Sequence, residues 1–167
     1  GTMEGAVPAI AGFAQNRKLA KPDDAMNRLY ALESRLSLTG SKADVRLPLR
    51  PSAAAPVAFA VANALHERHA RPFPAGLAPD VLAAFGIAAV AKQYGVEAAA
   101  LESLAGDLAS AGNSSLVLAG PSLPVEAHAA VALINTMLGV EVHSVDTAFS
   151  VYSPPIATPL DIAALTR

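Results

Sequence analysis

The chain has 167 residues, of which 53% are hydrophobic and 16% are charged, so it can bury a core and is not expected to be disordered. Its net charge of -2 gives no attraction for nucleic acid. Cysteine is absent, which excludes disulfides, thiolate metal sites, iron–sulfur ligands and cysteine nucleophiles within this sequence.

The first predicted elements alternate between helix and strand. We expect a helix over 8–20 and a strand over 28–34, although the Ala and Leu residues of the latter would also allow a helix. Two prolines in 45–51 predict an extended connection or a strand at a sheet edge. Ser52 is then predicted to cap a helix over 53–69.

The middle of the chain predicts two more helices and the clearest strand. A loop over 71–79, rich in Pro and Gly, precedes helices over 80–94 and 97–111. The segment 115–120 is continuously apolar and ends in glycine, which is typical of a buried parallel strand. A helix over 122–138 follows, with Ser122 or a neighbour as its cap.

The last part of the chain predicts short strands over 140–145 and 148–152 and a helix over 159–166. This alternation predicts one three-layer α/β/α domain over 1–167, with a mainly parallel, doubly wound sheet. We interpret the start as a cut inside a longer polypeptide, because it lacks the features of a signal peptide. No uninterrupted apolar stretch of about 20 residues occurs, so we expect no direct membrane insertion.

The turn at Gly120 is a candidate ligand site. A glycine between a strand and a helix can present backbone amides to an anion, but neither G-x-G-x-x-G nor the P-loop pattern is present. The same turn partly matches the G-x-S-x-G elbow of serine hydrolases, with Pro124 in place of the second glycine. Ser122 with His128 is therefore a candidate nucleophile and base, although helix capping explains Ser122 better.

Two histidines near the end of the predicted helix 53–69 could hold a metal. His66 and His69 are three residues apart, which allows one helix face, but no third ligand is evident. We expect them to interact with the negative end of the helix dipole instead. Because the sequence offers neither paired carboxylates nor a convincing triad, it predicts no catalytic residue and no metal ligand.

Two stretches carry a family resemblance. The first is Met26-Asn-Arg-Leu-Tyr-Ala-Leu-Glu-Ser34 with Leu38-Thr-Gly40, Ala43-Asp44 and Arg46-Leu-Pro-Leu-Arg50-Pro-Ser52, and the second is Ser115-Leu-Val-Leu-Ala-Gly120 with Pro124 and His128. Together they resemble the N-terminal, molybdopterin oxidoreductase-like part of the large iron–sulfur subunit of alternative complex III. That complex is a bacterial membrane quinol:electron-acceptor oxidoreductase, and related proteins are known as Tat-variant-translocated molybdopterin oxidoreductases. The resemblance covers most of 1–52 and 104–139, and 70–103 has no counterpart.

The resemblance implies a domain that has lost its cofactor. In the catalytic relatives, which hold a bis-pterin guanine dinucleotide, the segment resembling Leu47-Pro-Leu-Arg50-Pro51 continues as Gly-Thr-Asp, and the acidic side chain binds the guanine. Here Ser52-Ala53-Ala54 follow, so that carboxylate is missing. The family also implies that the iron–sulfur cysteines lie elsewhere in a parent chain, on the periplasmic side of a membrane.

Three hypotheses about function follow. The favoured one is a non-catalytic structural domain with no cofactor, whose partners are the iron–sulfur region of its parent chain and the other subunits of the complex. The second is a retained pterin- or nucleotide-binding domain, held by the loop Arg50-Pro51-Ser52 and the turn from Gly120 to Ser122. The third is a small serine hydrolase that uses Ser122 and His128.

Overall fold

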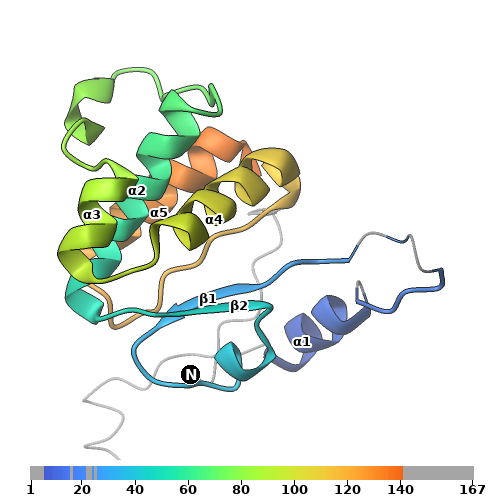
Figure 1. The fold of residues 1–167 in the computed structure, drawn as a ribbon. Coiled ribbons are helices and arrows are strands. Elements are labelled where there is room, and N and C mark those ends of the chain that lie inside the picture. The colour runs from blue at the N-terminus through green and yellow to red at the C-terminus, as the bar shows by residue number, and fades with distance from the viewer. Residues whose placement is uncertain (1–5, 16, 22–23, 25, 141–167) are drawn as a thin grey trace, which may run out of the picture.

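The structure is a computed structural model that describes residues 6–15, 17–21, 24 and 26–140. In chain order its helices and strands are α1 (Ala6–Gln15), β1 (Tyr30–Glu33), β2 (Val45–Pro48), α2 (Ala54–Glu67), α3 (Ile87–Tyr94), α4 (Ala98–Ala111) and α5 (Val125–Leu138). Figure 1 shows α2 to α5 on one side of the two strands, and α1 near the end where the strands begin. The protein is therefore a mixed α/β protein, as its sequence predicts.

The sheet of the described residues is a parallel pair of strands. Tyr30 of β1 lies opposite Val45 of β2, and the register continues to Glu33 opposite Pro48. The sequence predicts an extended segment over 45–51, and the structure confirms this for Val45–Pro48, which form β2. Pro48 is the last residue of that strand. Parallel strands usually need a connection of about a dozen residues or more, commonly a helix, and here residues 34–44 join them with a 3₁₀ turn in place of an α-helix.

Helix α2 is the centre of the core. Its apolar stripe consists of Val57, Val61, Ala64 and Leu65, and each is at most 3% exposed. The helix packs against α3, α4 and α5. Its α-helical bonding begins late because Pro56 has no N–H to donate, so a 3₁₀ turn comes first.

The predicted helix caps are wrong. Ser52 lies inside the 3₁₀ turn Pro51–Ala53, and α2 has Ala53 as an N-cap without a side-chain hydrogen bond. Ser122 lies in the turn before α5, whose N-cap is Pro124. Proline fixes φ near −65°, and this preset backbone lets both helices begin without a polar cap.

Two predicted helices are shorter than expected. The helix expected over 8–20 ends at Gln15, because the following backbone N–H groups bond in the tighter 3₁₀ pattern. The helix expected over 80–94 consists of a separate 3₁₀ turn and then α3 from Ile87. Gly86 interrupts it, since its backbone is extended with φ -67° and ψ 135°.

Glycines end three helices where the sequence predicts. Gly95 and Gly139 follow α3 and α5 in the left-handed conformation, with φ 68° and 73°. Gly112 follows α4 with φ 54°. The helices predicted over 97–111 and 122–138 are therefore confirmed as α4 and α5, although α5 starts at Val125.

The clearest predicted strand, 115–120, is not a strand in the structure. It runs beside the sheet in the same direction as β1 (Figure 1), but it forms no backbone ladder with any described residue. The amide of Asn135 on α5 replaces that ladder: the N–H of Val117 donates to its Oδ1 at 3.0 Å, and its Nδ2 donates to the carbonyl of Val117 at 2.8 Å. Leu116 and Leu118 are 47% and 69% exposed, so this apolar run is not buried on both faces.

The predicted elements 148–152 and 159–166, and all but the first residue of 140–145, lie outside the described residues. Val140 itself is fully buried in the core. Within the described part of the chain, every helix is too short or too polar to cross a membrane.

Candidate functional site

The candidate site lies where β2 ends and two helices begin. In open α/β proteins, ligands bind beyond the carboxyl ends of the strands. The loop Arg50-Pro51-Ser52 follows β2 and leads directly into α2. The turn from Gly120 to Pro124 leads into α5, and Figure 1 shows it on the same side of the molecule. Both segments of the predicted degenerate cofactor site therefore lie toward one end of the sheet.

The loop Arg50-Pro51-Ser52 lacks the paired acceptor that a guanine base would need. Arg50 is exposed, and the first turn of α2 contains no acidic side chain. The backbone N–H of Ala53 is already used by the carbonyl of Arg50 at 2.9 Å. A guanine edge presents two adjacent donors, which a carboxylate can accept together and the single hydroxyl of Ser52 cannot.

The structure does not join the serine hydrolase candidates. Ser122 and His128 are both exposed, and no hydrogen bond links them within the described part of the chain. A nucleophile elbow needs a strained, crowded turn. Gly120 does not have a positive φ, and a Cβ added to it would meet nothing within 4 Å. This turn is therefore neither strained nor crowded.

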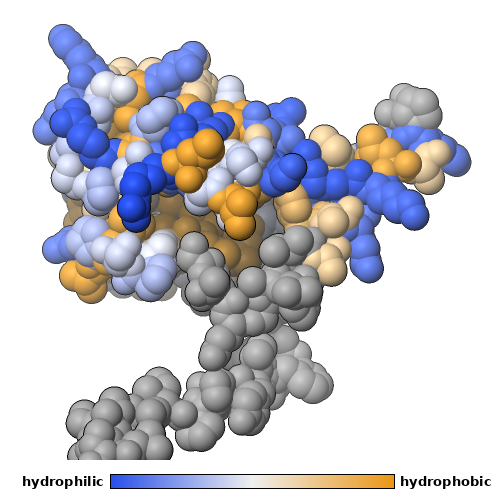
Figure 2. Space-filling model, turned by 90° about the horizontal axis from the view of Figure 1, so that it is seen from below, coloured by the Kyte–Doolittle hydropathy of each residue, from blue (hydrophilic) through white to orange (hydrophobic). Residues whose placement is uncertain are grey.

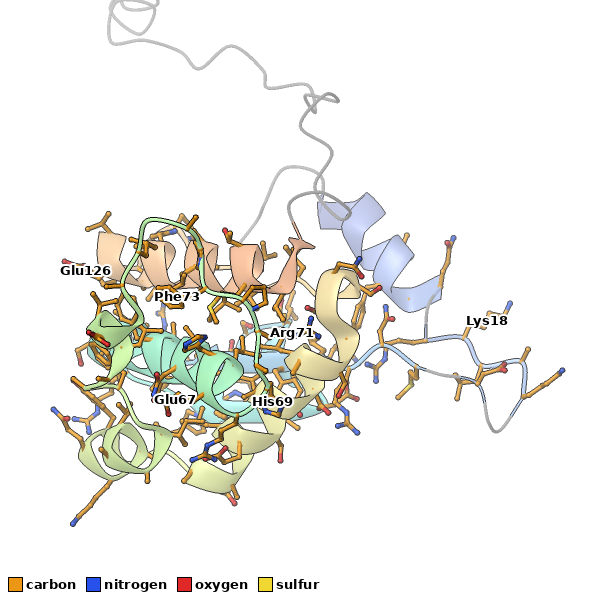
Figure 3. The ribbon with its side chains drawn as sticks, turned by 90° about the horizontal axis from the view of Figure 1, so that it is seen from above. Lys18, Glu67, His69, Arg71, Phe73 and Glu126 are labelled. Atoms are coloured by element: carbon orange, nitrogen blue, oxygen red, sulfur yellow. The ribbon has the colours of Figure 1, made fainter. Side chains whose placement is uncertain are left out.

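The two histidines at the end of α2, His66 within it and His69 just beyond it, lie in different surroundings. The ring of His66 packs edge-on against Phe73 at 5.4 Å, and its Nδ1 lies 3.2 Å from the carbonyl oxygen of Arg71. His69 is exposed just beyond the helix (Figure 3). Among the described residues no three potential metal-ligating side chains lie together. The structure thus gives His66 a packing role beside the loop that follows α2.

An open concavity of about 490 Å³ lies where α4 and α5 end, and the sequence did not predict it. Its lining includes Arg71, Gly112 and Gly139. The guanidinium of Arg71 donates to the carbonyl of Ala109 in the last turn of α4, beside which Figure 3 shows this side chain. A cation there stabilises the negative end of the helix dipole, so Arg71 is used within the fold.

A second polar cluster surrounds the carboxylate of Glu33 at the end of β1. Arg46 Nε donates to Glu33 Oε1 at 2.7 Å, and the backbone N–H of Ser37 donates to the same oxygen at 3.2 Å. The hydrogen bonds from Ser37 and Arg46 lower the pKa of Glu33 from 4.5 to about 2. Gly40 lies against this carboxylate, and a Cβ there would come within 1.8 Å of Oε1. The cluster therefore closes the loop between the strands.

Two further carboxylates connect separate parts of the chain. Asp107 on α4 accepts hydrogen bonds from the Tyr30 hydroxyl at 2.5 Å and from Arg28 at 2.6 Å, and these bonds lower its pKa. Asp44 accepts a paired hydrogen bond from Arg17 at 2.7 and 2.8 Å and another from the N–H of Leu29. The bond from Arg17 is the main reason that the pKa of Asp44 lies well below its usual range.

These three carboxylates all have cationic partners: Asp44 and Asp107 join segments that are distant in sequence, and Glu33 closes the loop between the two strands. Their lowered pKa values fit structural anions better than proton donors at neutral pH. The chain matches no known family model, and no curated protein matches it significantly.

Proposed function

We propose that this chain is a non-catalytic structural domain of a molybdopterin oxidoreductase-like iron–sulfur subunit, within a respiratory quinol:electron-acceptor oxidoreductase of the alternative complex III type. The observation that carries the proposal is the loop after β2. The Leu47-to-Pro51 stretch resembles the guanine-binding loop of the catalytic relatives, but Ser52-Ala53-Ala54 follow it and supply no carboxylate.

The arrangement of the resembling segments supports the proposal. The first segment contains both strands and leads into α2, and the second leads into α5. In the proposed architecture the complete domain is a three-layer, doubly wound α/β/α domain. The parallel pairing of β1 with β2, with α2 to α5 on one side of it, fits that arrangement (Figure 1).

The proposed partners are the iron–sulfur region of the parent chain and neighbouring subunits. Large apolar side chains at the surface support a covered domain, since isolated domains seldom expose many of them together. Leu36 and Leu38 are 68% and 90% exposed in the loop after β1, and Val125 is 74% exposed at the start of α5. Figure 2 shows hydrophobic surface, including a central hollow, on the side away from α2 to α5.

The experiment that tests the proposal is isolation of the tagged protein from membranes of its native host. We expect it to migrate on a native gel with iron and with quinol-oxidising activity. A protein that migrates alone, with no iron in its band, would contradict the proposed assembly.

A second measurement tests the loss of the cofactor. We expect the purified chain to contain no molybdenum and to show no amide NMR shifts near 48–54 or 120–124 when guanine nucleotide is added. The matched variant is Ala54→Asp, which restores a carboxylate at the third position after Pro51. Stoichiometric molybdenum, or saturable shifts in the unmodified chain, would favour the nucleotide-binding hypothesis instead.

A further inference from the structure

The loop that follows β1 presents two leucines to solvent. Leu36 and Leu38 are 68% and 90% exposed, and Leu38 is the most exposed large apolar side chain among the described residues. Ser37 between them is turned inward, because its N–H donates to Glu33 Oε1 and its hydroxyl accepts a hydrogen bond from the N–H of Gly40. The loop is therefore held with Ser37 towards the protein and both leucines away from it.

This arrangement is fixed by further bonds within the loop. The N–H of Ser41 donates to the carbonyl of Ser37 at 2.9 Å, and the Ser41 hydroxyl donates to the carbonyl of Leu38 at 2.8 Å. Gly40 is buried against the Glu33 carboxylate. A preformed loop loses little conformational entropy on binding, so the two leucines are already placed for a partner.

Two cations flank the leucines. Arg35 and Lys42 are exposed, and neither forms an ion pair with any described residue. Four other arginines each have a carboxylate partner, namely Arg17, Arg28, Arg46 and Arg68. The segment 34–42 contains no acidic residue, so it is locally positive in a chain whose net charge is -2. The loop thus combines a projecting apolar tip with positive charge that no described carboxylate neutralises.

We propose that the 34–42 loop docks on an anionic lipid surface. Exposed leucines indicate a surface that is covered, and the charge and shape of the loop determine by what. Figure 1 shows the loop at the margin of the molecule, on the side of the strands away from α2 to α5, where a flat surface can reach it. At a lipid surface the leucines enter the boundary between headgroups and acyl chains, and the long side chains of Arg35 and Lys42 reach the phosphates.

A protein partner fits these observations less well. It would need a pocket that matches both projecting leucines, whereas a lipid surface accepts a convex tip without one. Leucine is also under-represented among the residues that dominate protein interfaces. The proposed contact is confined to the lipid surface and requires no membrane-spanning helix.

The absence of tryptophan allows a direct test in the full chain, because Leu38→Trp introduces a single indole. The matched control is Leu77→Trp, since Leu77 is 55% exposed in the loop between α2 and α3. Vesicles that contain phosphatidylglycerol and phosphatidylcholine should shift the fluorescence of Leu38→Trp to shorter wavelength and leave that of Leu77→Trp unchanged. Vesicles of phosphatidylcholine alone should give a smaller shift, because they do not attract the cations.

Vesicle sedimentation separates the contributions of charge and apolar surface without an added tryptophan. Arg35→Gln with Lys42→Gln should weaken binding to the anionic vesicles at least about tenfold, since each cation near such a surface contributes about fivefold. Leu36→Ser with Leu38→Ser should also weaken it at least about tenfold, because the apolar area that enters the lipid is lost.

The control for both double variants is Leu77→Ser with Lys92→Gln, which removes an exposed leucine and an exposed cation elsewhere and should bind as the unmodified chain does. Failure of the unmodified chain to bind anionic vesicles would overturn the proposal and leave an acidic protein surface as the partner of the loop. Equal binding by the loop variants and the control would overturn it too. So would weaker binding in the cation variant alone, since the leucines would then lie outside the lipid. The inference does not depend on the proposed function, because purified protein and vesicles test it, whereas the native complex tests that function.

Discussion

Gly40 has no Cβ, and this leaves room for the Glu33 carboxylate and its partners Arg46 and Ser37. Any residue with a Cβ at position 40 would displace the Glu33 carboxylate from its partners Arg46 and Ser37. The conformational freedom of glycine is not the reason here, because Gly40 does not have a positive φ. The requirement comes from the close approach of the carboxylate.

The same carboxylate predicts a pH dependence of stability. The pKa of Glu33 is about 2 in the folded protein against an ordinary 4.5, so its contribution is present above about pH 4.5 and is lost as the pH falls towards 2. Glu33→Gln should therefore destabilise the protein at pH 6 and have a smaller effect at pH 3. Urea unfolding at both pH values measures this difference. The control is Glu67→Gln at an exposed position, and an equal effect of Glu33→Gln at both pH values would contradict the assignment.

The amide of Asn135 gives a second prediction at the residue scale. Asn135→Ala removes both hydrogen bonds to Val117 and leaves a partly buried N–H and carbonyl without them. We expect a loss of about 1–3 kcal/mol in the free energy of unfolding. Ser103→Ala is the control, because its hydroxyl bonds only the carbonyl of Ala99 on an exposed helix surface. Equal stability of the two variants would show that the Asn135 amide is not needed to hold 115–120.

At the scale of elements, α1 is held to the sheet by a polar link beyond its own end. Arg17 pairs with Asp44, and its guanidinium also lies 5.2 Å from the centre of the Phe13 ring. Asp44→Ala should release α1 while leaving α2 in place. Hydrogen exchange measured by mass spectrometry should show faster exchange in 6–15 and unchanged exchange in 54–67. Unchanged exchange in both segments would mean that other contacts hold α1.

The elements that the sequence predicts correctly are those whose signals are local. The apolar periodicity of α2 and the glycines after α3, α4 and α5 lie within the elements that they define. Pro56 is a local signal too, and it explains why α2 begins after a 3₁₀ turn.

The strand predicted over 115–120 fails for a physical reason. A continuous apolar run indicates that a segment needs burial, but it does not identify the neighbour that supplies it. The bond partner in the structure is the side chain of Asn135, 18 residues away from Val117. A distant polar contact of this kind has no local sequence signal.

The candidate site was predictable only in part. The sequence identified the loop Arg50-Pro51-Ser52 and the turn at Gly120, and the structure positions both before helices. It gave no signal for the cluster around Glu33 or for the position of Arg71, since both arise from folding of loops onto distant segments. The role of Ser122 as a cap was wrong, because proline begins α5 without one.

At the scale of the whole molecule, stability depends on α2 and the helices around it. Leu65 is fully buried, and Leu65→Ala should cost about 2–5 kcal/mol because it removes apolar contacts and leaves a cavity. Leu38→Ala, at a side chain 90% exposed, should change stability by less than about 0.5 kcal/mol. Urea unfolding followed by circular dichroism and by tyrosine fluorescence compares the variants. Similar losses in both would show that α2 is not the centre of stability.

The central position of α2 has a consequence for the order of folding. Helices α3 and α4 follow α2 directly in the chain, whereas α5 reaches it only after the whole intervening segment has been closed into a loop. We expect α2, α3 and α4 to assemble in the transition state and α5 to dock afterwards. Ile134→Val in α5 should then mainly accelerate unfolding, whereas Leu101→Ala in α4 should mainly slow refolding, as stopped-flow measurements of both rates would show.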